Sequence, residues 1–101
     1  MELKNLNINE LTIFVIKNID ETAKFTFCSI YKNVGMFGFD IMLKNNEYVP
    51  IFLVCSKDKI SVPIPKENFK SNKWNKFSFE KLNKNWKEFI FFIEQSNSQT
   101  L

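Results

Sequence analysis

The pattern of apolar and polar positions changes once along this chain, after the first two thirds. Before that point the apolar residues alternate with polar ones or form short dense runs, as is typical of β-strands. From Phe79 onward the apolar residues recur at spacings of three and four, which is typical of an amphipathic helix. The pattern therefore predicts an α+β domain in which strands come first and a helix comes last.

The strand-like part predicts an antiparallel meander of five or six short strands, as a curved sheet or a partly closed barrel. The expected strands are residues 5–9, 11–17, 23–32, 37–44, 48–55 and 60–64. The run 11–17 is apolar on both faces and rich in β-branched residues, so we expect it to be a central strand. Pro63 cannot donate to a ladder, which predicts that the last strand lies at an edge.

Alternation also predicts which strand faces are buried. Phe37, Phe39 and Ile41 are expected on the core face of their strand. In the strand 23–32, Phe25, Phe27 and Tyr31 are expected to share one face. Asparagines at 45 and 46 predict a short hairpin loop after the strand 37–44, because asparagine tolerates positive φ.

The C-terminal pattern predicts a helix from about Phe79 to Gln95, with Ser78 as its N-cap. Its apolar stripe consists of Phe79, Leu82, Trp86, Phe89, Ile90 and Ile93. Phe91 falls on the opposite side of the helix, where a single sheet does not cover it. It either contacts another chain or is a tolerated exposed phenylalanine. We expect residues 1–96 to form a single α+β domain and residues 97–101 to be a frayed tail.

Composition narrows the class of protein. The chain has 101 residues, enough for one core, and its twelve phenylalanines can fill that core. Its excess of lysine, asparagine, isoleucine and phenylalanine over glycine, alanine and arginine indicates an AT-rich genome. No apolar run is long enough to span a bilayer and no signal-peptide pattern begins the chain, so we expect a soluble, cytoplasmic protein. Cys28 and Cys55 are expected to be buried free thiols, with a disulfide as the alternative if their strands are adjacent.

The net charge of +3 is unevenly distributed, because residues 57–87 alone carry nine lysines and three acids. Within this block, Lys66, Lys70, Lys73 and Lys76 alternate with Phe69, Trp74 and Phe77. Lysines neutralise phosphates and exposed aromatic rings stack on unpaired bases. The other interpretation is a solvated loop whose lysines reflect codon bias and whose aromatic residues belong to the core.

Most catalytic chemistry is excluded by the residues that the chain lacks. Without histidine there is no Ser–His or Cys–His pair and no imidazole ligand for zinc. Two glycines cannot form a phosphate-binding loop. The carboxylates of Asp20, Glu21, Asp40 and Asp58 show no spacing typical of an acid–base pair, and all are expected at solvated positions. We therefore expect no catalytic, metal or cofactor site, and a protein that is not an enzyme.

The sequence favours a small non-catalytic protein-binding module: an adaptor, an inhibitor or a subunit of a larger assembly. Its predicted contact residues are Phe91, Trp74 and Phe77, and its partner is another protein or a second copy. The alternative is a single-stranded nucleic-acid-binding module that uses the four lysines and Trp74. Binding of anionic lipid is a weaker alternative.

Two families have a similar order of elements. Strands followed by a C-terminal helix that carries Trp86 resemble pleckstrin-homology-like domains, although the arginine-containing phosphoinositide motif is missing. Strands ending at 60–65 and followed by a helix also resemble the single-strand-binding transcriptional-coactivator fold, from which the inserted basic loop departs. Both resemblances imply a fold and leave the function open.

Overall fold

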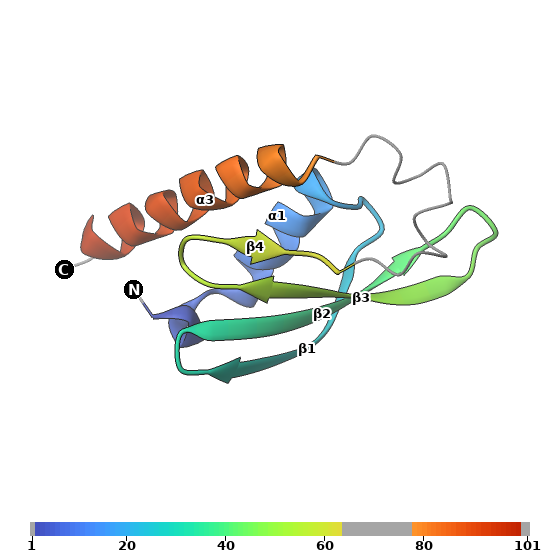
Figure 1. Cartoon of the computed structure of the whole chain (residues 1–101), viewed down its shortest axis with the longest axis horizontal. Helices are drawn as coiled ribbons and strands as arrows, with labels where there is room; N and C mark the ends of the chain where they lie inside the picture. The colour runs from blue at the N-terminus through green and yellow to red at the C-terminus, as the bar shows by residue number, and fades with distance from the viewer. Residues whose placement is uncertain (1, 64–77, 100–101) are drawn as a thin grey trace.

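A computed structural model of the chain describes residues 2–63 and 78–99, with side chains described as far as residue 96. Its elements are η1 (Leu3–Asn5), α1 (Ile8–Asn18), β1 (Lys24–Tyr31), β2 (Val34–Met42), β3 (Tyr48–Cys55), β4 (Ile60–Ser61) and α3 (Phe79–Gln99). Figure 1 shows one sheet with both helices on the same side of it. The predicted α+β layout, with an antiparallel sheet and a C-terminal helix, is confirmed.

The first two predicted strands are wrong. Residues 3–5 form a 3-10 turn and residues 8–18 form α1. Asn7 caps α1, because its side-chain oxygen accepts the N–H of Glu10 at 3.1 Å. Leu11, Phe14 and Val15 then fall on one helical face and are buried in the core. Packing of this face outweighs the strand preference of the β-branched residues.

The described sheet is an antiparallel meander in the order β1-β2-β3-β4. This sheet has four strands rather than the predicted five or six. Because β1 and β4 are its two edges, the predicted closure into a barrel is not confirmed. Neither resemblance to a known family anticipated the N-terminal helix α1. The predicted edge position of the last strand is confirmed, although β4 has only two residues.

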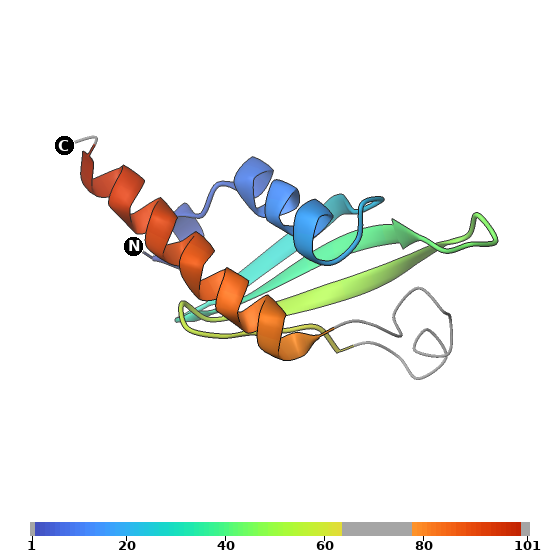
Figure 2. The ribbon, with the colours of Figure 1, turned by 90° about the horizontal axis from the view of Figure 1, so that it is seen from above.

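The core lies between the sheet and the two helices (Figure 2). Phe37, Phe39 and Ile41 of β2 face it, as predicted, opposite Ile51 and Leu53 of β3. The hairpin loop after β2 has Asn46 at a positive φ of 65°, also as predicted. The β1–β2 turn lies at residues 32–33.

A β-bulge in β1 overturns the predicted faces of that strand. Phe25 pairs with Phe39, but Phe27 pairs with Gly38, so the register shifts by one residue around Thr26. Phe25 therefore packs against the core, whereas Phe27 and Tyr31 face away from it.

Helix α3 begins where the sequence predicts and ends later. The N–H of Lys81 donates to Ser78 Oγ at 3.2 Å, which confirms Ser78 as the N-cap. The helix runs to Gln99, so the predicted end at Gln95 is wrong. The frayed tail at residues 97–101 stays a prediction. Among the described residues, no helix is long and apolar enough to cross a membrane.

Candidate functional site: a groove between the helices and an open sheet face

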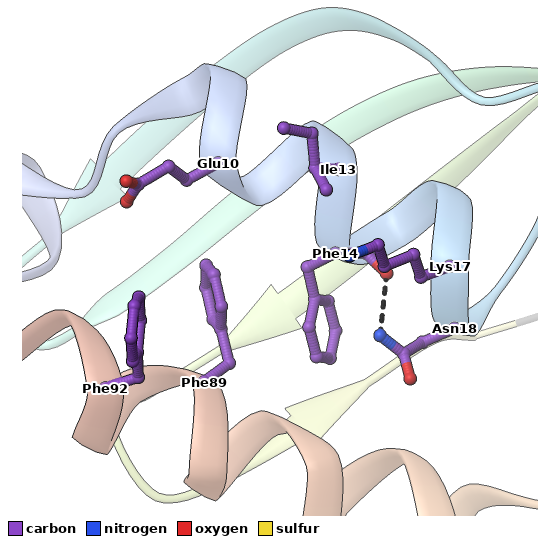
Figure 3. Close-up of a pocket in the computed structure, with 7 residues that line it drawn as sticks. All are labelled: Glu10, Ile13, Phe14, Lys17, Asn18, Phe89 and Phe92. Atoms are coloured by element: carbon purple, nitrogen blue, oxygen red, sulfur yellow. Dashed lines mark hydrogen bonds between the residues drawn. The ribbon is translucent and has the colours of Figure 1, made fainter.

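A groove lies between α1 and α3 on the outer side of the helical layer (Figure 3). It encloses about 250 Å³ and its lining residues are Glu10, Ile13, Phe14, Lys17, Asn18, Phe89 and Phe92. Phe14 of α1 and Phe89 of α3 pack together with a ring separation of 5.0 Å and form its apolar floor. Glu10 and Lys17 place opposite charges on the α1 border.

The groove is held open by contacts between the two helices. Asn85 of α3 donates to Asn18 Oδ1 of α1 at 2.8 Å, and Asn18 donates to the carbonyl of Phe14 at 2.9 Å. Trp86 lies beneath the floor, with ring separations of 5.4 Å from Phe14 and 5.5 Å from Phe89. The aromatic floor and the asparagine pair therefore fix the spacing of the helices.

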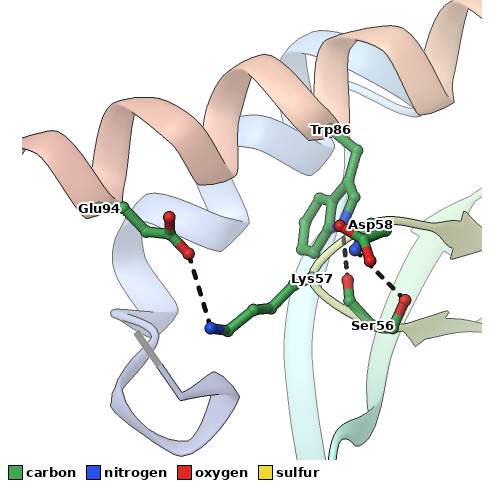
Figure 4. A network of polar contacts seen from close by, with 5 residues as sticks. All are labelled: Ser56, Lys57, Asp58, Trp86 and Glu94. Carbon is green, nitrogen blue, oxygen red and sulfur yellow. Dashed lines mark hydrogen bonds and ion pairs between the residues drawn. The ribbon is translucent and has the colours of Figure 1, made fainter.

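Trp86 also fastens α3 to the sheet. Its side chain is fully buried, and its indole N–H donates to the carbonyl of Ser56 at 2.9 Å (Figure 4). Lys57 and Glu94 form an ion pair at 3.8 Å nearby, but both are well exposed, so this pair adds little stability. The indole therefore links α3 to the β3–β4 turn, beside the two hydrogen bonds between Asn83 of α3 and Ile60 of β4.

The expected exposure of Phe91 is confirmed. Its side chain is 64% exposed, and that of the neighbouring Phe92 is 65% exposed. Phe92 lines the groove, whereas Phe91 lies outside it on the outer face of α3. Its role in partner binding stays a prediction.

The other predicted contact residues cannot be placed. Trp74, Phe77, Lys66, Lys70, Lys73 and Lys76 all lie outside the described residues. Their roles in protein or nucleic-acid binding therefore stay predictions.

A second apolar surface, which the sequence did not predict, covers the side of the sheet that faces away from the helices. This open face carries Phe27 of β1, Met36 of β2 and Phe52 of β3, with Tyr31, Val34 and Tyr48 towards its ends. The rings of Phe27 and Phe52 are 5.8 Å apart and lie on either side of Gly38. The bulge at Thr26 turns Phe27 to this face, and periodicity alone does not reveal a bulge.

One of the described acids, Asp20, has a structural position in the fold. Asp20 was expected at a solvated position, but it is only 5% exposed and accepts hydrogen bonds from the N–H and the hydroxyl of Thr22. The N–H of Met42 donates to the same hydroxyl at 2.8 Å, so Asp20 and Thr22 join the start of β1 to the end of β2. No group of three or more potential metal ligands occurs among the residues that the structure describes.

Both cysteines are free, but only one is buried as predicted. Cys28 is exposed on β1, whereas Cys55 is buried at the end of β3. Burial raises the pKa of the Cys55 thiol to about 12. Cys55 is therefore an inert core residue, and Cys28 is the accessible thiol of the two.

Comparison with protein-family models, with curated proteins and with solved structures gives no match for this chain. The two apolar surfaces described above are therefore the features of this chain that bear on its function.

Proposed function

We propose that this chain is a small non-catalytic protein-binding module whose docking surface is the α1–α3 groove. The observation that carries the proposal is the apolar floor of Phe14 and Phe89, bordered by the 65%-exposed ring of Phe92. Exposed clustered aromatic residues in a concave site are typical of protein interfaces. The absence of histidine from the chain supports a non-catalytic role.

The groove fits an amphipathic helix of a partner protein. Two helices that lie side by side leave a channel into which a third helix places its apolar stripe. Glu10 and Lys17 are seven residues apart on α1, which is about 10.5 Å along the axis. The partner helix is therefore expected to carry a basic residue and an acidic residue two turns apart, beside its apolar stripe.

The proposal is tested by identifying a partner protein and mapping where it binds on this chain. Proteins that cross-link to the wild-type chain are identified by mass spectrometry and then purified for binding measurements. A true partner loses at least about tenfold in affinity with Phe92→Glu, which charges the groove border, and retains affinity with Ser61→Lys on the sheet. A partner that binds both variants equally, or whose cross-links fall outside a helix, contradicts the groove as its docking surface.

The role of Phe91 is tested separately, because it lies beside the groove and not in it. Phe91→Ser lowers the affinity for the same partner if the interface extends over the outer face of α3. Unchanged binding limits the interface to the groove and overturns the prediction for Phe91.

The open sheet face favours a second candidate function, the binding of single-stranded nucleic acid. Phe27 and Phe52 are 40% and 36% exposed, and such rings on a sheet can stack on unpaired bases. The lysines predicted to contact phosphates lie outside the described residues.

Fluorescence anisotropy of a labelled oligothymidylate tests this second candidate. Binding at low ionic strength that weakens steeply with salt, and that Phe27→Ala reduces, supports it. No rise in anisotropy at low ionic strength rejects it.

A further inference from the structure

The two edges of the sheet differ in how far they are protected against pairing with a further strand. At the β4 edge, Asn83 of α3 accepts the N–H of Ile60 at 3.0 Å and donates to its carbonyl at 3.1 Å. The strand has only two residues, and Pro63 follows it. This edge is therefore closed to a further strand, in the ways that natural sheets use.

The β1 edge lacks all three of these protections, although it carries the bulge at Thr26. β1 is the outermost strand, eight residues long, and Figure 1 shows no element beyond it. No charged side chain occurs from Phe25 to Tyr31, and most side chains of the strand are exposed. Long uncharged edge strands are competent to pair with another strand.

The charges at the ends of this segment indicate which strand would pair with it. Glu21 and Lys32 are both exposed and lie at opposite ends of residues 21–32. The bulge leaves Thr26 without an opposite residue, so a two-fold axis at Phe27 would pair Phe25 with Cys28 of the other copy and bring each Glu21 beside Lys32. A register centred on Cys28 would instead place Lys32 opposite Ala23, so that Glu21 and Lys32 would no longer meet.

We propose that β1 pairs antiparallel with β1 of a second copy of this chain, in the register that joins Glu21 to Lys32 of the copy. The two sheets become one sheet of eight strands, with an isologous two-fold interface. The open faces become continuous, and Phe27 and Tyr31 of both copies lie along the seam. This interface lies at the sheet edge and does not depend on the α1–α3 groove.

A single strand pair buries less than the ~1,200–2,000 Å² typical of stable interfaces, so the dimer is expected to dissociate on dilution. Size-exclusion chromatography with light scattering measures this directly. The mass should rise from 12.0 kDa towards twice that value as the concentration approaches about 1 mM. A mass that stays at 12.0 kDa over the whole range overturns the proposal and leaves the edge to a strand of another protein.

Charge reversal tests the register. Glu21→Lys and Lys32→Glu each replace two attractive contacts per dimer with repulsive ones, so each should weaken dimerisation at least about fivefold. The double variant restores opposite charges and should return the dissociation constant to within about twofold of the wild type. Dimerisation that is unaffected by the single reversals, or not recovered in the double variant, overturns this register.

A matched pair of lysine substitutions separates the β1 edge from other interfaces. Cys28→Lys places a charge in the middle of β1 and should abolish the dimer, whereas Ser61→Lys at the β4 edge should leave it intact. Circular dichroism and the melting temperature confirm that both variants are folded. Equal dimerisation of the two variants overturns the assignment to β1.

Cross-linking gives an independent measurement, because Cys28 is exposed and Cys55 is buried with a pKa of about 12. A short bismaleimide should yield a dimeric product with the wild type and none with Cys28→Ser. A product that persists at equal yield in Glu21→Lys contradicts the proposed pairing.

Discussion

Gly35 and Gly38 of β2 each lie against an aromatic ring, but the two rings differ in how far they can move. A methyl group at Gly35 would lie 2.7 Å from the ring of Phe37, which is completely buried. A methyl group at Gly38 would lie 2.4 Å from the ring of Phe27, which is exposed on the open face. Both contacts are too short for carbon atoms, so one partner must shift.

We expect Gly35→Ala to lower the free energy of unfolding by about 1–3 kcal/mol, because the core around Phe37 cannot yield. Gly38→Ala also brings the methyl group within 2.8 Å of Thr26 Oγ1, but it should cost less because the exposed side chains of Thr26 and Phe27 can both move into solvent. Urea unfolding followed by circular dichroism compares the two variants. The opposite order would mean that the Phe27 ring is held as firmly as a core residue.

Cys55 makes the stability depend on pH in the alkaline range. Its pKa is about 12 in the folded protein and 9.0 in a model thiol, so the folded state retains the proton that the unfolded state releases. Stability is therefore complete below pH 9 and falls as the pH rises from 9 towards 12, by at most about 1.4 kcal/mol per pH unit.

The measurement for Cys55 is the free energy of unfolding at pH 8, 9 and 10. Cys55→Ala removes the thiol and should flatten the curve, although its stability at pH 8 is lower. The titration of lysines is common to both proteins and cancels in the comparison. Parallel curves for the two proteins would contradict the raised pKa.

At the scale of elements, the sequence correctly predicted the strands and the helix in which the apolar residues follow a clear period. The three long strands and α3 follow alternation or helical spacing, and each was predicted within a few residues. The segment 8–18 was mistaken because a run that is apolar on both faces fits a buried strand as well as a helix. Its N-terminal signal was present: Asn7, followed three residues later by Glu10, is typical of a helix start.

The bulge in β1 and the groove could not be predicted from the pattern. The bulge depends on how β1 pairs with β2, and one inserted residue reverses every later side chain. The groove requires α1 and α3 to lie together, which follows from the burial of Phe14 against Trp86 and Phe89. Phe91 was predictable because the helical stripe alone places it outside.

The N-cap of α1 can be tested at the same scale. Asn7→Ala removes the acceptor for the N–H of Glu10 and should lower the free energy of unfolding by about 1 kcal/mol. Asn7→Asp keeps the acceptor and should be close to the wild type. Thermal and urea unfolding provide the measurement, and equal losses in both variants would contradict a capping role.

At the scale of the whole molecule, Trp86 joins the three parts of the domain. It contacts Phe14 of α1, lies on α3, and donates to Ser56 at the β3–β4 turn. Phe91, five residues along the same helix, contacts solvent instead. Trp86 therefore stabilises the fold, whereas Phe91 is available for binding.

Trp86→Phe should lower the free energy of unfolding by about 2–3 kcal/mol, because it removes buried volume and leaves the Ser56 carbonyl without the indole donor. Phe91→Ser should change it by less than about 0.5 kcal/mol, as exposed positions do. Urea unfolding monitored by circular dichroism measures both. If Phe91→Ser destabilised the chain as much as Trp86→Phe, its effect on partner binding would reflect folding. A neutral Phe91→Ser variant makes any loss of partner binding a direct property of the surface.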